Sequence, residues 1–197
     1  TAVGVNALLR NTTASNNTAI GKDALLTNTT GSQNVAVGAS AFDASTTSSN
    51  CVAIGHNALT TQTAAADNVA VGKDALKLNT TGNFNTAIGK DSLESNTTAS
   101  NNTAVGTDSL KANTTGTNNV AVGIQALASN TTANHNTALG RVCLFDNTTG
   151  EKNTAVGSGV LANNTTASNN TGLGFECLTQ NTTGTQNVAV GAFALDA

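Results

Sequence analysis

A 17-residue motif recurs along the whole chain and constrains its fold more than any other feature. In the second unit it reads TAIGKDALLTNTTGSQN. A unit this short cannot enclose a core alone, so the units are expected to stack as coils of one solenoid. We interpret residues 1–197 as a single repeat domain, a fragment or subunit of a longer fibre. All complete units have 17 residues except 35–50, which is one residue shorter, and 51–68, which is one residue longer. The coils begin at Thr1, Thr18, Val35, Cys51, Val69, Thr86, Thr103, Val120, Thr137, Thr154, Thr171 and Val188.

Some positions of the repeat hardly vary, and these predict the interior of each coil. With the positions numbered as columns one to seventeen, Gly fills column four in all twelve units, and Ala and Leu fill columns two and eight in eleven. Asn closes every complete unit, with Asn50 in that role at the end of the short one. Coils stacked about 4.8 Å apart place identical side chains above one another. The predicted core ladder includes Leu25, Leu76, Leu93, Leu110 and Leu127, and the predicted Asn ladder includes Asn85, Asn102, Asn119, Asn136 and Asn153.

The remaining columns predict an all-β fold, a parallel β-solenoid of about twelve coils. Thr or Val, Ala, and Val or Ile open each unit and predict a short strand. The small residue and Leu that follow favour a tight turn, 3₁₀ or helical, over a bent second strand. The Asn-Thr-Thr segment has the residues of turns and side-chain ladders. A second, 34-residue period appears in column fourteen, where Ala99, Gly116, Ala133 and Gly150 alternate.

The strand motif, as in Asn34–Gly38 and Asn119–Gly123, resembles the repeat of trimeric autotransporter adhesin heads. The 17-residue unit with Asn-Thr-Thr-Gly is similar to repeats of phage tail fibres and bacterial surface proteins. The resemblance implies a β-roll that forms a homotrimer at a cell surface or on a virion and binds host surfaces, matrix or glycans. The unit is longer here than in adhesin heads, and the regular Asn-Thr-Thr segment is an addition.

Composition argues against several function classes. Only 10% of residues are charged and the net charge is −3, which favours neither nucleic acid nor an anionic membrane as a partner. No run approaches the roughly 20 apolar residues of a membrane-spanning helix, so we expect no membrane insertion. A stacked repeat places like beside like, and the two histidines, His56 and His135, lie in different columns. We therefore expect no enzyme activity and no cofactor.

Two sets of polar residues are candidate sites with a structural alternative. Asp74, Asp91 and Asp108 share column six of successive coils, which makes them a weak candidate for binding a metal cation. Lys73 and Lys90 adjoin them, so a solvated charged strip is the favoured interpretation. The Asn-Thr-Thr segments also match the glycosylation acceptor pattern, although bare ladders are favoured. The candidate glycosylation positions include Asn28, Asn79, Asn96 and Asn113.

The columns of small residues leave two interpretations open. If Val and Ile point into the coil, Ala87, Ala104 and Ala121 point outward and let another subunit approach closely. Alternatively, the Ala column is an interior corner. The three cysteines are expected to be small buried residues without a disulfide bond.

Together these features predict a non-enzymatic structural and adhesive module of an extracellular fibre, which associates with itself as a homotrimer or a head-to-tail filament. The alternatives are a solenoid that binds ice or glycans and a tail-fibre shaft. Adjacent Thr columns, twelve and thirteen, weaken the ice-binding alternative because an extended chain points them to opposite faces.

Overall fold

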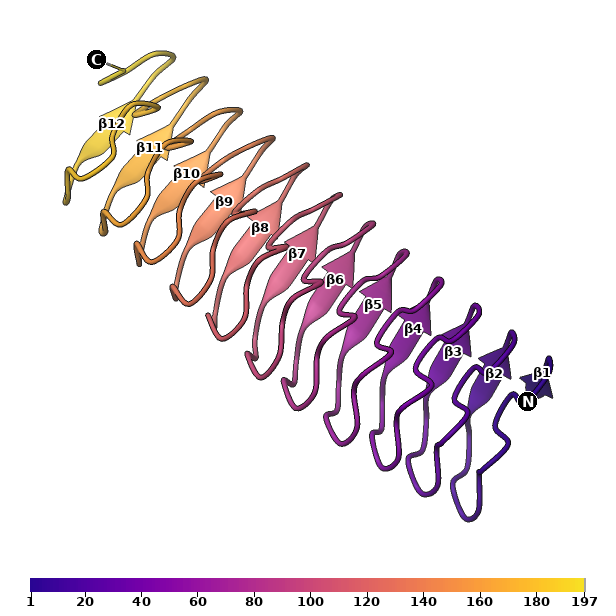
Figure 1. Ribbon diagram of the computed structural model, residues 1–197. Helices are drawn as coiled ribbons and strands as arrows, with labels where there is room; N and C mark the ends of the chain where they lie inside the picture. The colour runs from indigo at the N-terminus through magenta and orange to yellow at the C-terminus, as the bar shows by residue number, and fades with distance from the viewer. Residues whose placement is uncertain (197) are drawn as a thin grey trace.

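Twelve short parallel strands stack along one axis in the computed structural model, which describes residues 1–196 (Figure 1). They form one sheet in sequence order, and turns connect each strand to the next, so the predicted β-solenoid is confirmed. The described residues form no helix. The strands are β1 (Ala2–Val3), β2 (Thr18–Ile20), β3 (Val35–Val37), β4 (Val52–Ile54), β5 (Val69–Val71), β6 (Thr86–Ile88), β7 (Thr103–Val105), β8 (Val120–Val122), β9 (Thr137–Leu139), β10 (Thr154–Val156), β11 (Thr171–Leu173) and β12 (Val188–Val190).

The register corrects one predicted coil boundary. Val35 of β3 pairs with Val52, and Val52 pairs with Val69, so both coils keep the 17-residue period. The coil that was predicted to begin at Cys51 therefore begins at Val52, and the expected shorter and longer units do not exist. Cys51 occupies column seventeen, the closing Asn column, and Asn50 precedes it. A parallel ladder shifted by one residue would exchange the inward and outward faces of β4, which explains why the period is kept.

The strand directs its small residue inward and its large residues outward. Ala is buried in the middle of each strand from β2 to β10, whereas Ile20, Ile54 and Ile88 are about two-fifths exposed. Ala87, Ala104 and Ala121 are 0% exposed, so the interpretation of these residues as a subunit interface is wrong. They line an interior corner beside the Leu column. Leu25, Leu76, Leu93, Leu110 and Leu127 lie in one continuous core with 0% exposure.

The segment after each strand is a run of tight turns rather than a 3₁₀ helix. The residues of columns six and eight have positive φ, as for Asp91 (56°) and Leu93 (50°). Their N–H groups bond along the rod in opposite directions: Asp91 donates to the carbonyl of Lys73 in the preceding coil, and Leu93 donates to that of Ser109 in the following one. Left-handed backbone is costly for Leu, but here it places the side chain in the core and pairs the backbone with neighbouring coils.

Two Asn ladders run along the interior, as predicted. In column seventeen, the Nδ2 group of Asn102 donates to the carbonyl of Gly116, and its Oδ1 accepts the N–H of Asn119. In column eleven, Nδ2 of Asn96 donates to Oδ1 of Asn79 in the preceding coil. These side chains satisfy backbone groups that the short strands leave unpaired, which a buried turn requires.

The 34-residue period has a steric origin in column fourteen. A Cβ atom on Gly82, Gly116 or Gly150 would overlap the carbonyl oxygen of the Ala that occupies the same column in the next coil. Hydrogen bonds also join successive coils in this segment. Both Thr114 and Thr115 donate N–H groups to the carbonyl of Thr131, and the N–H of Thr117 donates to Oδ1 of Asn134. At Gly82, Gly116 and Gly150 the backbone therefore lies closer to the next coil than an Ala side chain would allow.

Exchanging the residues of this alternation should have unequal effects. We expect Gly82→Ala to destabilise the fold by about 1–3 kcal/mol, because the new methyl group overlaps backbone of the next coil. Ala99→Gly lacks a clash and should cost no more than about 1 kcal/mol, through chain entropy. Urea denaturation of both variants measures the difference. Equal losses in the two variants would contradict the steric explanation.

The third coil contains a gap in the column-eleven ladder. Ser45 stands there in place of Asn, and both Oδ1 of Asn28 and Oγ of Ser45 lack a hydrogen-bond partner in the described chain. We expect Ser45→Asn to stabilise the protein by about 1 kcal/mol, because the new Nδ2 would donate to Asn28. Thermal unfolding should show a higher midpoint for this variant and no change for Ser95→Asn, which lies outside the ladder. A lower midpoint for Ser45→Asn would show that the column cannot accommodate an amide there.

Candidate functional surfaces

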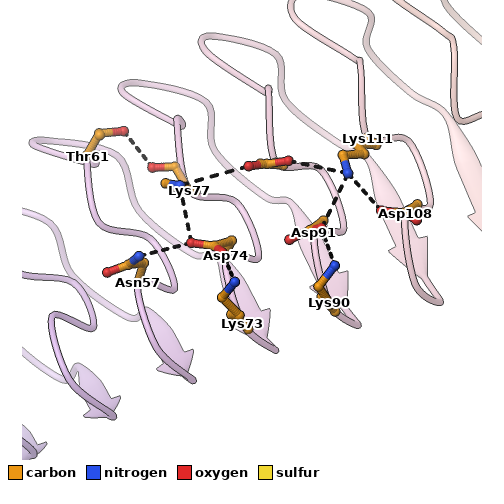
Figure 2. Close-up of polar contacts among 10 residues, drawn as sticks. Asn57, Thr61, Lys73, Asp74, Lys77, Lys90, Asp91, Asp108 and Lys111 are labelled. Atoms are coloured by element: carbon orange, nitrogen blue, oxygen red, sulfur yellow. Dashed lines mark hydrogen bonds and ion pairs between the residues drawn. The ribbon is translucent and has the colours of Figure 1, made fainter.

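One ion-pair cluster joins three adjacent coils on the turn that follows β5, β6 and β7 (Figure 2). Nζ of Lys73 lies 3.2 Å from Oδ2 of Asp74, and Nζ of Lys77 lies 3.3 Å from Oδ1 of the same residue. Nδ2 of Asn57 also donates to Oδ1 of Asp74, over 3.0 Å. Each carboxylate oxygen of Asp74 therefore already has a cationic or amide partner.

The same arrangement continues into the next coils. Lys90 and Lys111 contact Asp91 at 2.8 and 3.3 Å, and Lys111 also lies 3.0 Å from Asp108. Glu94 lies 3.9 Å from Lys77 and 3.8 Å from Lys111, which connects the two parts of the cluster. The cluster contains four Lys and four carboxylates, so its formal charges cancel.

This geometry does not support the metal site considered for Asp74, Asp91 and Asp108. The described residues contain no group of three or more His, Cys, Asp or Glu arranged to hold a metal ion. All three residues occupy a position with φ of 56–57°, and Asp and Asn tolerate left-handed backbone better than most residues. The recurrence of Asp in column six is therefore explained by the left-handed turn that the backbone makes there. This column is also less solvated than predicted, because Asp74 and Asp91 are buried.

The electrostatics of the cluster predict a pH effect on stability. Burial disfavours charged Asp91, but hydrogen bonds from Lys90 and Lys111 outweigh burial and hold its pKa below the ordinary value. The pKa of Asp74 is lowered in the same way, by Asn57, Lys73 and Lys77 against burial. Since the unfolded chain has the higher pKa, about 3.9, it binds protons first as pH falls. The stabilisation is therefore present above about pH 4 and lost below it.

Replacing both carboxylates isolates this effect. We expect the unfolding temperature of the natural chain to fall more steeply between pH 5 and pH 2.5 than that of an Asp74→Asn, Asp91→Asn double variant. Asn tolerates the left-handed backbone at these positions, so the variant removes charge with little change of conformation. Thermal unfolding followed by circular dichroism across this range measures both slopes. Parallel curves would show that the cluster does not contribute to acid sensitivity.

The Asn residues considered for glycosylation are inaccessible in the folded chain. Asn28, Asn79, Asn96 and Asn113 are each 0% exposed. Nδ2 of Asn96, the atom that would carry a glycan, donates both to Asn79 and to the carbonyl of Ala99. A sugar at this atom would replace one of these bonds and has no space in the core. The glycosylation interpretation is therefore wrong for the folded chain. These Asn side chains instead form the interior hydrogen-bonded ladder of column eleven.

The other reactive side chains form no common site. His56 follows β4 and His135 precedes β9, and both are exposed. Cys51, Cys143 and Cys177 are buried free thiols, as expected. Burial raises the pKa of Cys143 to about 11, so its thiol stays protonated near neutral pH and is a poor nucleophile.

The Thr columns differ in exposure. The first Thr of the Asn-Thr-Thr segment is half-buried where Thr80 and Thr97 lie, and Oγ1 of Thr80 donates to the carbonyl of Thr97. The second Thr, as in Thr81 and Thr115, is exposed. The second Thr column is therefore the more open to solvent of the two.

A surface that the sequence analysis missed lies on the outside of the sheet. The first and last residues of the strands point outward, and they are Thr, Val, Ile or Leu throughout β2–β12. One signal for this orientation was present in the repeat. Column three varies among Val, Ile and Leu, whereas column two is almost always Ala, and an outward column tolerates more variation than a packed one.

No family model matches the chain, and no curated protein or solved structure is significantly similar to it. No helix in the described residues is long and apolar enough to cross a membrane.

Proposed function

We propose that the chain is a non-catalytic structural module, a stiff rod within an extracellular fibre of a cell surface or virion that presents its outer columns to a binding target. The observation that carries this proposal is the unbroken ladder of twelve parallel strands, each paired with the next at the 17-residue period. At about 4.8 Å per coil this ladder makes a rod roughly 55 Å long.

The connections between coils support a stiff rod. Bonds along the axis occur in the strands, in the turn after them and in both Asn ladders, so adjacent coils are attached on several sides. Bending the rod would stretch bonds on one side while the opposite side is compressed. Because each coil contacts only its neighbours, added coils lengthen the rod without altering its cross-section.

The outward columns support a display role. In column sixteen, Phe84, His135 and Lys152 have the same backbone conformation, with φ of 57°, 60° and 57°, although their side chains differ in kind. The frame therefore positions chemically different groups at regular intervals without changing its own geometry. A fixed scaffold with variable exposed side chains is suited to recognition of a surface.

The display role can be tested by changing outer side chains alone. Beads coated with the chain should be retained under flow on at least one of three surfaces, namely matrix protein, a glycan array and host cells. A variant with Ser or Asn at Phe84, His135 and Lys152 should be retained at least tenfold less, provided its circular dichroism is unchanged. Equal retention of both proteins, or retention of neither, would contradict an adhesive function. Immunogold labelling of intact cells or virions tests the proposed location.

A further inference from the structure

The outward side of the sheet is a continuous stripe of Val, Ile, Leu and Thr, two side chains wide, which we call the sheet face. It consists of the first and last residues of strands β2–β12, which neighbour one another along the rod (Figure 1). None of these residues is charged and none carries an amide. The most exposed large side chains of the inner coils on this face, each 38–45% exposed, are Ile20, Ile54, Ile88, Val122, Leu139 and Leu173.

The extent of this face is unusual for a surface that stays in water. Monomeric soluble proteins rarely expose a contiguous apolar patch larger than a few hundred Å². From the exposed fractions, eleven strands present on the order of 1,000 Å² per chain, against roughly 800 Å² per partner in a standard-size interface. The sheet face alone is therefore large enough for a stable dimer.

We propose that the sheet face binds the sheet face of a second copy of this chain, with the two rods parallel and in register. This inference deepens the proposed function by naming the rod's partner, yet the two can fail separately, because a monomeric rod would still be a rod. A second copy is favoured because its parallel strands follow one another at the same spacing along the rod, so its side chains meet this face at every coil. A partner with another spacing would lose register within a few coils.

The residue sizes favour the parallel arrangement. When two parallel rods are related by a twofold axis along their length, the last strand residue of one copy faces the first strand residue of the same coil in the other. Four of the five Ile or Leu residues at the last position share a strand with Thr at the first, as in Thr86 with Ile88 and Thr171 with Leu173. A large side chain then packs against a smaller one. In antiparallel rods, the last strand residues of one copy would instead face the last strand residues of the other, so the large side chains would meet one another.

Sedimentation of matched variants tests the dimer. The natural chain should sediment with the mass of two 19.5 kDa chains, and an Ile54→Lys, Ile88→Lys, Val122→Lys variant with the mass of one. We expect dissociation to become at least 100-fold more favourable in this variant, because opposing lysines would be buried together. The control, Thr47→Lys, Thr81→Lys, Thr115→Lys, places three charges at the same 34-residue intervals in an exposed column and should remain a dimer.

Circular dichroism identifies any variant that fails to fold, and single substitutions at Ile88 and at Thr81 then replace the triple ones. A natural chain that sediments as a monomer, or an interface variant that remains a dimer, would overturn the proposal. A mass of three chains would overturn the two-copy geometry.

Disulfide trapping tests the register. In a background with Cys51→Asn, Cys143→Ala and Cys177→Ala, a Val35→Cys chain is mixed with a Val37→Cys chain and oxidised. The parallel arrangement brings these two positions together across the interface, so the mixture should form a disulfide-linked dimer while each chain alone should not. In an antiparallel pair the third coil lies opposite a coil near the other end, and no link would form. Absence of the mixed dimer would therefore exclude the parallel register.

Discussion

Replacing Gly106 with Ala is expected to destabilise the rod by more than about 3 kcal/mol. Gly106 has φ of 132°, which side-chain-bearing residues rarely adopt, and an added Cβ atom would lie 2.5 Å from the carbonyl oxygen of Gly123. That oxygen belongs to backbone fixed by the next coil. Neither the local conformation nor the neighbouring coil can adjust without breaking ladder bonds.

Urea denaturation of Gly106→Ala should show this loss, and hydrogen exchange should locate it in the coils around β7. Gly159→Asn is the matched control, because Gly159 has φ of 70° in column six, where Asn57 and Asp91 adopt the same backbone region. It should change stability little. If both variants are equally stable, the close approach of glycines between coils is not a requirement of the fold.

Replacing Asn119 with Ala should cost about 2–5 kcal/mol, because the change leaves two buried backbone groups without partners. Oδ1 of Asn119 accepts the N–H of Asn136 over 2.9 Å, and its Nδ2 donates to the carbonyl of Ala133 over 2.8 Å. Both groups belong to the following coil, so the side chain bonds one coil to the next. The unfolding free energy measured in urea should fall accordingly.

The control for this prediction is the neighbouring residue. Asn118 is in column sixteen, where its side chain is exposed and its φ is 58°. Asn118→Gly keeps the left-handed backbone and should alter the unfolding free energy by less than about 0.5 kcal/mol. Similar losses at the two positions would mean that the column-seventeen ladder contributes no more than an exposed Asn.

The columns that hardly vary could be predicted from the sequence, because identical buried residues repeat at a constant interval. Leu93 and Asn102 belong to such columns, and each lies in the interior. The boundary at Cys51 was wrong because an apolar residue after Asn50 resembles the start of a strand. Gly55, one full period after Gly38, is the better anchor, since the geometry of column four admits only Gly.

The direction of the strand could not be derived from alternation alone. Two β-branched residues flanking Ala usually mark the buried side of a strand, yet Ile88 is exposed and Ala87 is buried. The interior of a coil with a three-residue strand is narrow, and Leu from column eight already fills it. The left-handed conformation of Leu93 was also unpredictable, because no residue preference of Leu indicates it.

Distances between spin labels along one column test the central claim most directly, namely that the 17-residue coils stack in register. In the chain without native cysteines, label pairs at Thr47 with Thr115, Thr149 or Thr183 lie four, six and eight coils apart in the exposed Thr column. Diluted with unlabelled chain, they should give separations of roughly 19, 29 and 38 Å, a linear increase of about 4.8 Å per coil. Separations that do not grow with the number of coils between the labels would contradict the solenoid.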